Sequence, residues 1–151
     1  MRDWADLERD EPTIAAAGRR LLEDEPGLPG VAFLATVSVG GRPRMHPFIP
    51  AVVDGALWAF VIISPKQRDL ENGGQYAIHA RLGADDEQFL VSGVATRVDD
   101  LEARERVAES MPFDDIDEQH ILYRFGIDRA LWTTWATPTA PTHRSWAEPS
   151  A

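Results

Sequence analysis

The pattern of apolar and polar residues changes its period near residue 28. Between Ile14 and Leu22 apolar side chains recur at helical spacing, with Pro12 before the segment and Pro26-Gly27 after it. Proline in the first helical turn and a Pro-Gly pair beyond the last turn are typical helix boundaries. We therefore predict an N-terminal helix that ends before residue 26, followed by segments that alternate with the period of two of β-strands.

Turn signals divide the segment that follows into three β-rich runs. The runs cover residues 32–39, 43–53 and 56–63, and they are separated by Gly40-Gly41 and Asp54-Gly55. An Asp-Gly pair between apolar runs is a strong signal for a β-hairpin. Because proline cannot donate to a strand ladder, Pro43, Pro47 and Pro50 predict an edge strand, a bulge or an irregular segment that faces a ligand.

The rest of the chain predicts three more strands and two helical segments. The strands cover residues 75–82, 88–99 and 121–135, and the helical segments are a short turn in "SPKQRDLENGG" and a helix over residues 100–111. Strands do not alternate with long helices, so a doubly wound parallel sheet is excluded. We predict a mainly β fold with peripheral helices, a small barrel or sandwich of antiparallel strands. One domain with an N-terminal helix is expected over residues 1–136, and an extended C-terminal tail over residues 137–151.

Charge and composition narrow the classes of function. The formal net charge is −10, which disfavours general binding to nucleic acid or to an anionic membrane. There is no cysteine, so disulfides, thiolate nucleophiles and Cys-ligated zinc are excluded. The longest apolar run, Ala56–Ile63, is too short to span a bilayer, and the acidic N-terminus lacks the apolar core of a signal peptide. These features predict a cytoplasmic protein.

Residues for hydrolytic or metal chemistry do not form a recognisable pattern. The four histidines could be combined with serine and aspartate into a triad on paper, but no serine lies in a nucleophile-elbow sequence. The histidines are also scattered, without the spacing of a known metal site. We assign no catalytic residue and no metal ligand.

A cluster of basic residues between positions 42 and 68 is the main chemical feature. It contains Arg42, Arg44, His46, Lys66 and Arg68, and Lys66 is the only lysine of the chain. If the second and third β-rich runs pair about the Asp54-Gly55 turn, the basic residues gather at one end of the sheet beside the hydroxyl group of Ser64. Cationic side chains, a hydroxyl group and the first backbone N–H groups of a helical turn suit a phosphate. The alternative is that Lys66 and Arg68 cap a solvent-exposed loop.

Residues 31–99 resemble the FMN-binding split-barrel family, the pyridoxamine 5′-phosphate oxidase-like proteins. The matching pieces are "FLATVSVGGRPRMHPFIP", "LWAFVIISPKQRDLENGGQYAIHA" and "DDEQFLVSGVATRVDD", in the same order and at the same spacing. The resemblance implies a six-stranded antiparallel split β-barrel that forms a homodimer with two cofactor sites at its interface. It also implies FMN or the deazaflavin coenzyme F-420 as the cofactor.

The resemblance further implies which residues bind the cofactor. Ser64, Pro65 and Lys66 fall on the phosphate-binding motif that follows the third strand. Residues 46–49, which include His46, Pro47 and Phe48, fall on the segment that lines the phosphate and the isoalloxazine ring. Gln88 falls on a glutamine that the partner subunit contributes. His46 and Pro65 replace arginines of the family motif, and Arg44 and Arg68 are the candidates to compensate for them.

The same resemblance argues against vitamin B6 oxidation. The substrate lysine of true pyridoxamine phosphate oxidases falls on Ala51, and their C-terminal Arg/His motif has no clear counterpart here. We expect an FMN- or deazaflavin-dependent oxidoreductase that acts on an unidentified small molecule, in which the cofactor supplies the hydride chemistry. One alternative is a non-catalytic cofactor- or haem-binding protein, with His46 or His79 as the haem ligand. Another is a structural dimer whose cofactor site has decayed.

Overall fold

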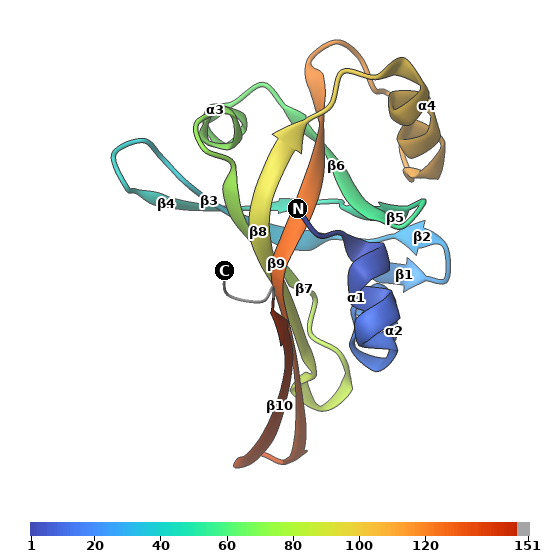
Figure 1. Ribbon diagram of the computed structural model, residues 1–151, viewed down its shortest axis with the longest axis vertical. Coiled ribbons are helices and arrows are strands. Elements are labelled where there is room, and N and C mark those ends of the chain that lie inside the picture. Colours follow the sequence, from blue (N-terminus) through green and yellow to red (C-terminus); the bar gives the residue numbers. More distant parts are fainter. Residues whose placement is uncertain (148–151) are drawn as a thin grey trace.

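Residues 1–147 are described by a computed structural model of the chain (Figure 1). The N-terminal region forms two helices, α1 (Trp4–Asp10) and α2 (Pro12–Leu22), rather than one. Asp3 caps α1 by accepting a hydrogen bond from the backbone N–H of Asp6, and the Asp6 carboxylate accepts one from the N–H of Asp3. A short hairpin of β1 (Glu23–Glu25) and β2 (Leu28–Pro29) follows.

All other strands belong to one antiparallel sheet, in the order β4-β3-β7-β8-β9-β6-β5. β10 pairs with the C-terminal half of β9, on the edge opposite β8. The strands are β3 (Ala32–Val37), β4 (Pro43–Phe48), β5 (Ala51–Val53), β6 (Ala56–Ile62), β7 (Gln75–Ala80), β8 (Gln88–Arg97), β9 (His120–Thr137) and β10 (Ala140–Ala147). Between them lie α3 (Pro65–Glu71), a 3₁₀ turn over Ala84–Asp86 and α4 (Leu101–Ser110). The prediction of a mainly β fold with antiparallel strands and peripheral helices is confirmed.

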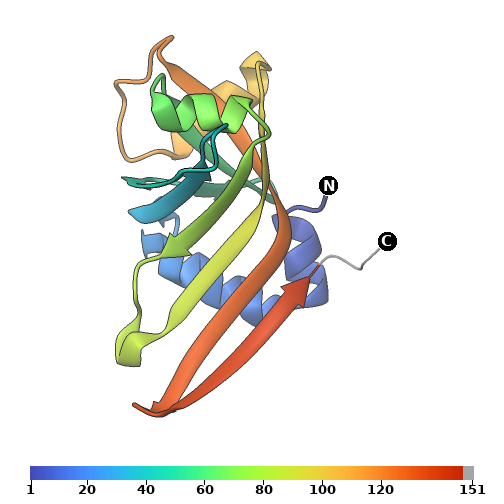
Figure 2. The ribbon, with the colours of Figure 1, turned by 90° about the vertical axis from the view of Figure 1, so that its left-hand side faces the viewer.

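The expected count of six strands is wrong, since the sheet has eight. The run predicted over residues 43–53 is broken at Ile49 and Pro50 into β4, which pairs with β3, and β5, which pairs with β6. The hairpin at Asp54-Gly55 is present, and both residues have the positive φ of a type I′ turn. Because β4 and β5 form opposite ends of the sheet but are joined by two residues, the sheet curls round without closing (Figure 2).

The eighth strand comes from the segment expected as a C-terminal tail. Residues 140–147 of that segment pair with Arg129–Thr137 of β9 as β10, and residues 148–151 lie outside the described part of the chain. Trp146 of β10 is buried in the main core and donates a hydrogen bond from its indole N–H to Asp10, over 3.0 Å. The segment is thus extended, and it is anchored to the N-terminal helices.

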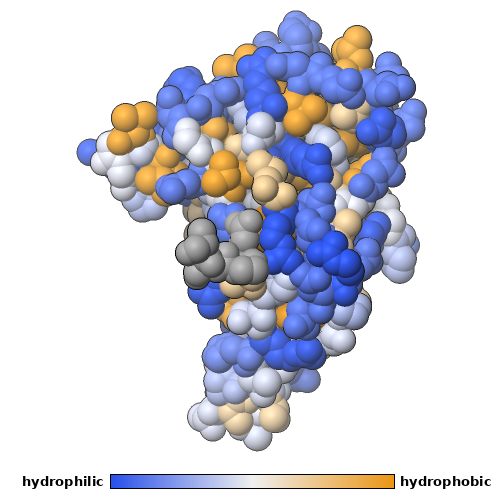
Figure 3. All heavy atoms as spheres, in the orientation of Figure 1, coloured by the Kyte–Doolittle hydropathy of each residue, from blue (hydrophilic) through white to orange (hydrophobic). Residues whose placement is uncertain are grey.

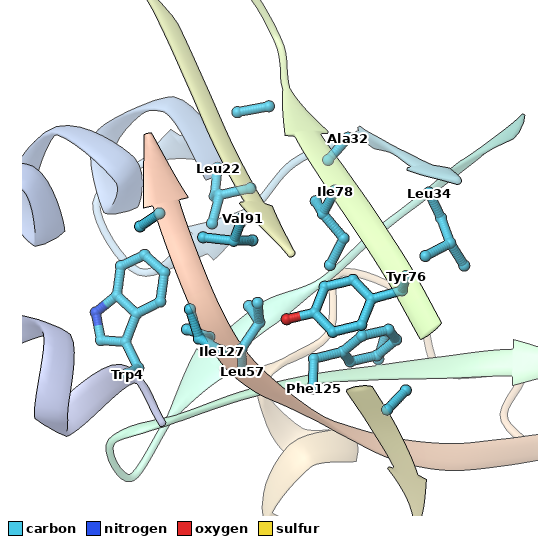
Figure 4. Close-up of a cluster of buried hydrophobic side chains, with 14 of the residues drawn as sticks. Trp4, Leu22, Ala32, Leu34, Leu57, Tyr76, Ile78, Val91, Phe125 and Ile127 are labelled. Carbon is cyan, nitrogen blue, oxygen red and sulfur yellow. The ribbon is translucent and has the colours of Figure 1, made fainter. Parts of the chain in front are cut away.

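The main core lies between the curled sheet and the helices α1 and α2 (Figure 4). Trp4 and Phe89 meet edge to face at 5.9 Å, and Tyr76 and Phe125 do so at 4.8 Å. The Tyr76 hydroxyl is buried with them and donates a hydrogen bond to the carbonyl of Gly126. Burial raises the pKa of this hydroxyl, so it stays a donor.

Strand β6 separates this core from a second one. Six of its seven residues are buried, because Leu57, Ala59 and Val61 face the main core while Trp58 and Phe60 face α4. Trp58 and Phe60 are therefore core residues of the α4 side. No helix within residues 1–147 is long and apolar enough to cross a membrane.

Candidate functional site

The inner face of β4 carries three of the residues singled out from the sequence. Arg44, His46 and Phe48 lie directly opposite Thr36, Leu34 and Ala32 of β3, whose side chains are buried. Opposite residues of an antiparallel pair share one face, so all three side chains of β4 point inward. Phe48 meets Phe125 of the core edge to face at 6.0 Å. Pro47 lies between them on the opposite face and is exposed.

Helix α3 places Lys66 beside this row. Ser64 caps the helix: its hydroxyl oxygen accepts from the backbone N–H of Gln67 over 3.3 Å, and its hydroxyl proton is donated to the carbonyl of Ile62 over 2.7 Å. The Ser64 hydroxyl is thus engaged in holding the helix. Lys66 is half-buried and makes no ion pair within residues 1–147, and Arg68 is exposed and also makes none there.

Arg44 is fixed to the same helix through a buried carboxylate. Asp69 of α3 accepts a hydrogen bond from Nε of Arg44 and another from the hydroxyl of Thr36, both over 2.8 Å. The Asp69 side chain is only 6% exposed, whereas that of Arg44 is 36% exposed. Asp69 therefore holds the guanidinium by one edge. The two terminal nitrogens of Arg44 make no hydrogen bond with the described residues, which leaves them available to a ligand.

His46 is the polar residue at this site without a partner. Its Nε2 atom is buried and makes no hydrogen bond within the described chain. Burial, together with the charges of Lys66 and Arg44, lowers the pKa of His46 below its usual value of 6.5, and the opposing effect of Asp69 is smaller. A buried polar atom without a partner normally costs stability, and Nε2 of His46 is one of four such side-chain atoms in the described chain.

Lys66 and Phe48 line a groove of about 240 Å³ between the end of β4, β6 and the loop that follows α4, whereas Arg44 and His46 lie beside it and are not among its lining residues. Its lining is mainly apolar, with Lys66 and His120 as the basic side chains; the lining residues are Pro47, Phe48, Ile49, Phe60, Val61, Ile62, Lys66, Phe113 and His120. Larger hollows of about 880 and 610 Å³ lie along α4 and at the start of β8. The one basic residue of the α4 hollow, Arg104, is already bound to backbone carbonyls, so we place the site by its chemistry and not by volume.

His120 is a site residue that the sequence did not reveal. It begins β9 and lies opposite Ile62 of β6, which brings it to the groove. Nδ1 of His120 lies 3.0 Å from a carboxylate oxygen of Asp117. Only the spacing of three residues between Asp117 and His120 is visible in the sequence, and such a spacing is too common to identify a pair.

Gln88 does not join the other predicted residues within one chain. It begins β8 and lines the hollow of about 610 Å³ with Trp135, Asp85 and Asp86. Helix α3 lies by the other end of β8, where the N–H of Ala95 binds the carbonyl of Gly74. At about 3.3 Å per residue, the distance between Gln88 and Ala95 along the strand is roughly 20 Å.

The other side of α3 carries a polar network in which every group has a partner. The Tyr123 hydroxyl donates to Glu71 over 2.8 Å, and the Gln67 amide donates to both Tyr123 and Glu71. Arg97 forms an ion pair with Glu71 over 3.2 Å. Burial raises the pKa of Tyr123, so its hydroxyl remains protonated.

The donor set on β4 and α3 fits a phosphate-bearing cofactor. The Arg44 guanidinium, the Lys66 ammonium and the His46 Nε2 atom are nitrogen groups with unused hydrogen-bonding capacity, and Lys66 lines a groove whose apolar walls suit a flat ring. Lys66, Arg44, His46 and Phe48 lie near one another, but not through the hairpin that the sequence suggested. β4 does not pair with β6, and the residues meet because α3 packs on β3, the neighbour of β4.

Comparison with known proteins places the fold. No family model matches the chain, and no curated protein matches it in sequence. Among solved structures, an FMN-binding protein from Nostoc punctiforme related to pyridoxamine 5′-phosphate oxidase matches with a TM-score of 0.62 and 14% identity, over 93% of this chain and 96% of its own. The chain has the pyridoxamine 5′-phosphate oxidase-like split-barrel fold.

Two haem proteins share this split-barrel fold. A haem-binding protein from Mycobacterium smegmatis matches with a TM-score of 0.63 and 16% identity over 87% of this chain, which spans 57% of that protein's length. A haem storage protein from Vibrio cholerae matches with a TM-score of 0.58 and 18% identity, over 84% of this chain and 91% of its own. At these identities the likeness confirms the predicted resemblance at the level of the fold.

Proposed function

We propose that the chain binds FMN or a deazaflavin coenzyme at the groove and uses it in the oxidoreduction of a small molecule. The observation that carries the proposal is the meeting of Lys66, Arg44 and the unpaired Nε2 of His46 beside an apolar groove. Three nitrogen groups on two elements form a local basic site in a chain whose net charge is −10. An anionic group is the ligand that such a site favours.

In this proposal the phosphate lies between β4 and α3. Arg44 supplies the guanidinium that the family motif has at the position of His46, and Asp69 orients it from behind. Arg68 is too exposed to be more than a peripheral contact. Lys66 supplies a compact charge, and the fixed Arg44 fork supplies directional hydrogen bonds.

The apolar part of the groove would hold the ring. Phe48, Ile49 and Phe113 provide flat or branched surfaces, and Phe60 closes the floor from the second core. When bound, a flavin or deazaflavin supplies the two-electron chemistry itself. The contribution of this chain is then to anchor the phosphate, orient the ring and exclude water.

A homodimer is part of the proposal, because one chain provides only part of a site. The groove of about 240 Å³ is smaller than the roughly 300–1,000 Å³ of typical small-molecule sites. The outer face of the sheet exposes an apolar patch formed by Phe33, Val37, Met45 and Val94, part of which is visible over the β3–β4 hairpin in Figure 3. A second copy on this patch would cover it and could bring its own Gln88 to the groove.

Haem binding is the second candidate. Histidine is a common ligand of haem iron, and two proteins with this fold bind or store haem. Nε2 of His46 has no hydrogen-bond partner within the described chain, which favours it as a ligand over a histidine whose ring is engaged. His79 lies on the outer face of β7, opposite Phe33, and so does not reach the groove.

A titration with FMN, the deazaflavin coenzyme and haemin tests these proposals. We expect micromolar binding of one cofactor, and a loss of at least about tenfold, or about 1.4 kcal/mol, in Lys66→Ala. Arg42→Ala is the matched control, since it removes one exposed charge from the turn after β3. Sedimentation of the same samples should give the mass of a dimer.

Three outcomes would contradict the proposal. If no cofactor binds, the site does not serve a flavin or haem. If Lys66→Ala and Arg42→Ala weaken binding equally, only the long-range charge matters and the phosphate is not at α3. A monomer mass for the cofactor-bound protein would exclude a site that is shared between two chains.

A further inference from the structure

His120 is held on one side and free on the other. Nδ1 lies 3.0 Å from a carboxylate oxygen of Asp117. Arg104 of α4 donates to the backbone carbonyls of His120 and Asp117, over 2.7 and 2.6 Å, and its guanidinium lies over the ring of Phe60 at 5.1 Å. The loop that carries the imidazole is therefore fixed from behind.

The second ring nitrogen is available to the groove. The His120 side chain is 14% exposed and lines the groove together with Lys66. Nε2 makes no hydrogen bond within residues 1–147, and it is not among the buried atoms without a partner there. A ligand in the groove can thus reach Nε2.

The protonation of the ring decides what Nε2 can bind. The backbone N–H of Asp117 also donates to Nδ1, over 3.2 Å, so a neutral ring has two possible arrangements. Nδ1 either donates to the Asp117 carboxylate and leaves a lone pair at Nε2, or accepts from the Asp117 N–H and leaves an uncharged N–H donor at Nε2. The imidazolium form carries a second N–H at Nε2, which can donate a charge-assisted hydrogen bond.

We propose that His120 is a further anion-binding residue of the groove, whose protonated ring binds the phosphate group held by Lys66, so that affinity rises as the pH falls. The proposal extends the proposed function at the same site. The phosphate is that of FMN or free inorganic phosphate, and titration with FMN, riboflavin and inorganic phosphate separately distinguishes the two.

The other charged groups near the ring do not obscure this effect. Asp117 is the carboxylate in contact with it, Arg104 approaches from α4, and Lys66 from α3. On β4, Arg44 is partly neutralised by Asp69. His46 is the other titratable group; its pKa is lowered, so it gains its proton at a more acidic pH than an unperturbed histidine, and it is the same in every variant compared.

The first experiment measures FMN affinity at several pH values for the wild type, His120→Gln and His120→Lys. The ratio of the Kd of His120→Gln to that of the wild type cancels the ionisation of FMN itself and of His46. We expect this ratio to rise as the pH falls, to about tenfold near pH 6, because the charged ring binds phosphate more strongly than the neutral one. His120→Lys, which is charged throughout, should bind with wild-type or better affinity at both ends of the range.

Riboflavin is the matched control ligand, because it has the ring without the phosphate. Its affinity ratio should stay near one at every pH. A ratio for FMN that does not change with pH would overturn the proposal, because a purely structural role of His120 predicts that result. A riboflavin ratio that rises as FMN's does would also overturn it, since the contact would then be to the ring.

A titration with inorganic phosphate tests the contact between His120 and an anion without any flavin. The ring signals of His120 are assigned in NMR spectra by their loss in His120→Gln and are then followed during a phosphate titration near pH 6. A saturating shift supports the anion contact even if no flavin binds, in which case only the proposed function fails. Unchanged His120 signals would overturn the contact even if FMN binds at Lys66.

Discussion

The two sides of α3 carry polar residues in opposite states. On one side Gln67 and Glu71, one turn apart, form a network with Tyr123 and Arg97 in which each group has a partner. On the other side Lys66 makes no ion pair within the described residues, and Nε2 of the neighbouring His46 is buried without a partner. The same seven-residue helix thus has a satisfied side and an unsatisfied one.

The difference between the two sides of α3 suggests a structural role for the Gln67 side and a ligand-binding role for the Lys66 side. Buried polar groups are nearly always hydrogen-bonded, so a complete network is what a structural role requires. Unpaired nitrogen groups beside a groove form no hydrogen bond that stabilises the described chain, but they can bind an anion. Substitutions on the Gln67 side should therefore change the free energy of unfolding, and those on the Lys66 side should change affinity.

Asp69 contributes both to stability and to ligand affinity, so we expect its substitution to have the largest effect of those considered. It is the acceptor for both the buried Thr36 hydroxyl and Arg44. Asp69→Ala leaves both donors without a partner, so we expect the free energy of unfolding to fall by about 2–4 kcal/mol and FMN affinity to fall with it. Urea unfolding measured by circular dichroism checks the first effect, and the FMN titration checks the second.

Asp69→Asn is the control for this substitution. It keeps an acceptor for Thr36 and Arg44 and removes only the charge, so it should lose less stability than Asp69→Ala. If Asp69→Ala unfolds at the wild-type urea concentration, the two hydrogen bonds of Asp69 do not hold the site together. Wild-type FMN affinity in a folded Asp69→Ala would mean that Arg44 needs no anchor.

Tyr123→Phe tests the satisfied side and should have the next largest effect. It removes the hydroxyl that links Gln67 to Glu71, so we expect a loss of about 1–2 kcal/mol in the free energy of unfolding. FMN affinity should stay within about twofold of the wild type, because the hydroxyl is on the side away from Lys66. Tyr76→Phe is a matched control, since it removes a buried hydroxyl that bonds to the backbone carbonyl of Gly126 and takes no part in the network of Gln67, Glu71 and Tyr123.

A change in FMN affinity in Tyr123→Phe that Tyr76→Phe does not share would break the comparison. The network would then position Lys66, and the two sides of α3 would act as one unit. Unchanged stability in Tyr123→Phe would also contradict the comparison between the two sides of α3, because the network would then contribute nothing to folding.

Local signals were enough to predict most of the fold. The strands β3, β6, β7 and β8 follow from alternation and turn residues, and the Asp54-Gly55 hairpin is present with positive φ at both positions. Pro50 was recognised as an irregularity, but whether it bends a strand or divides one depends on pairing partners elsewhere. β10 was missed because its Pro- and Thr-rich sequence has no strong alternation, and it is a strand only because β9 is long enough to pair with it.

Some residues of the site could also be predicted from the sequence, and others could not. Lys66 and Arg44 were predictable from the charge pattern, whereas His120 reaches the groove only through the register that sets it opposite Ile62. That register joins two strands far apart in the sequence, and no local pattern encodes it. Asp69 looked like an ordinary helix residue, and its role follows from packing against Thr36 and Arg44.

The smallest expected effect is a change of stability with pH that comes from His46, on the Lys66 side of α3. The pKa of His46 is lowered in the folded chain, so the unfolded chain binds a proton more readily. Its contribution to stability is complete above about pH 6.5 and is lost as the pH falls toward the folded pKa. Glu87, whose pKa is also lowered, acts only at more acidic pH. Urea unfolding between about pH 7.5 and 5.5 should show a decline that is smaller in His46→Gln.

A bound anion should reverse this effect, because a phosphate beside Nε2 favours the protonated ring of His46. With saturating FMN the decline should therefore shrink in the wild type and stay unchanged in His46→Gln. An equal decline in both proteins without ligand would mean that burial does not disfavour the charged ring. A decline that FMN leaves unaltered in the wild type would place the phosphate away from β4, and the unpaired Nε2 of His46 would then have no part in binding.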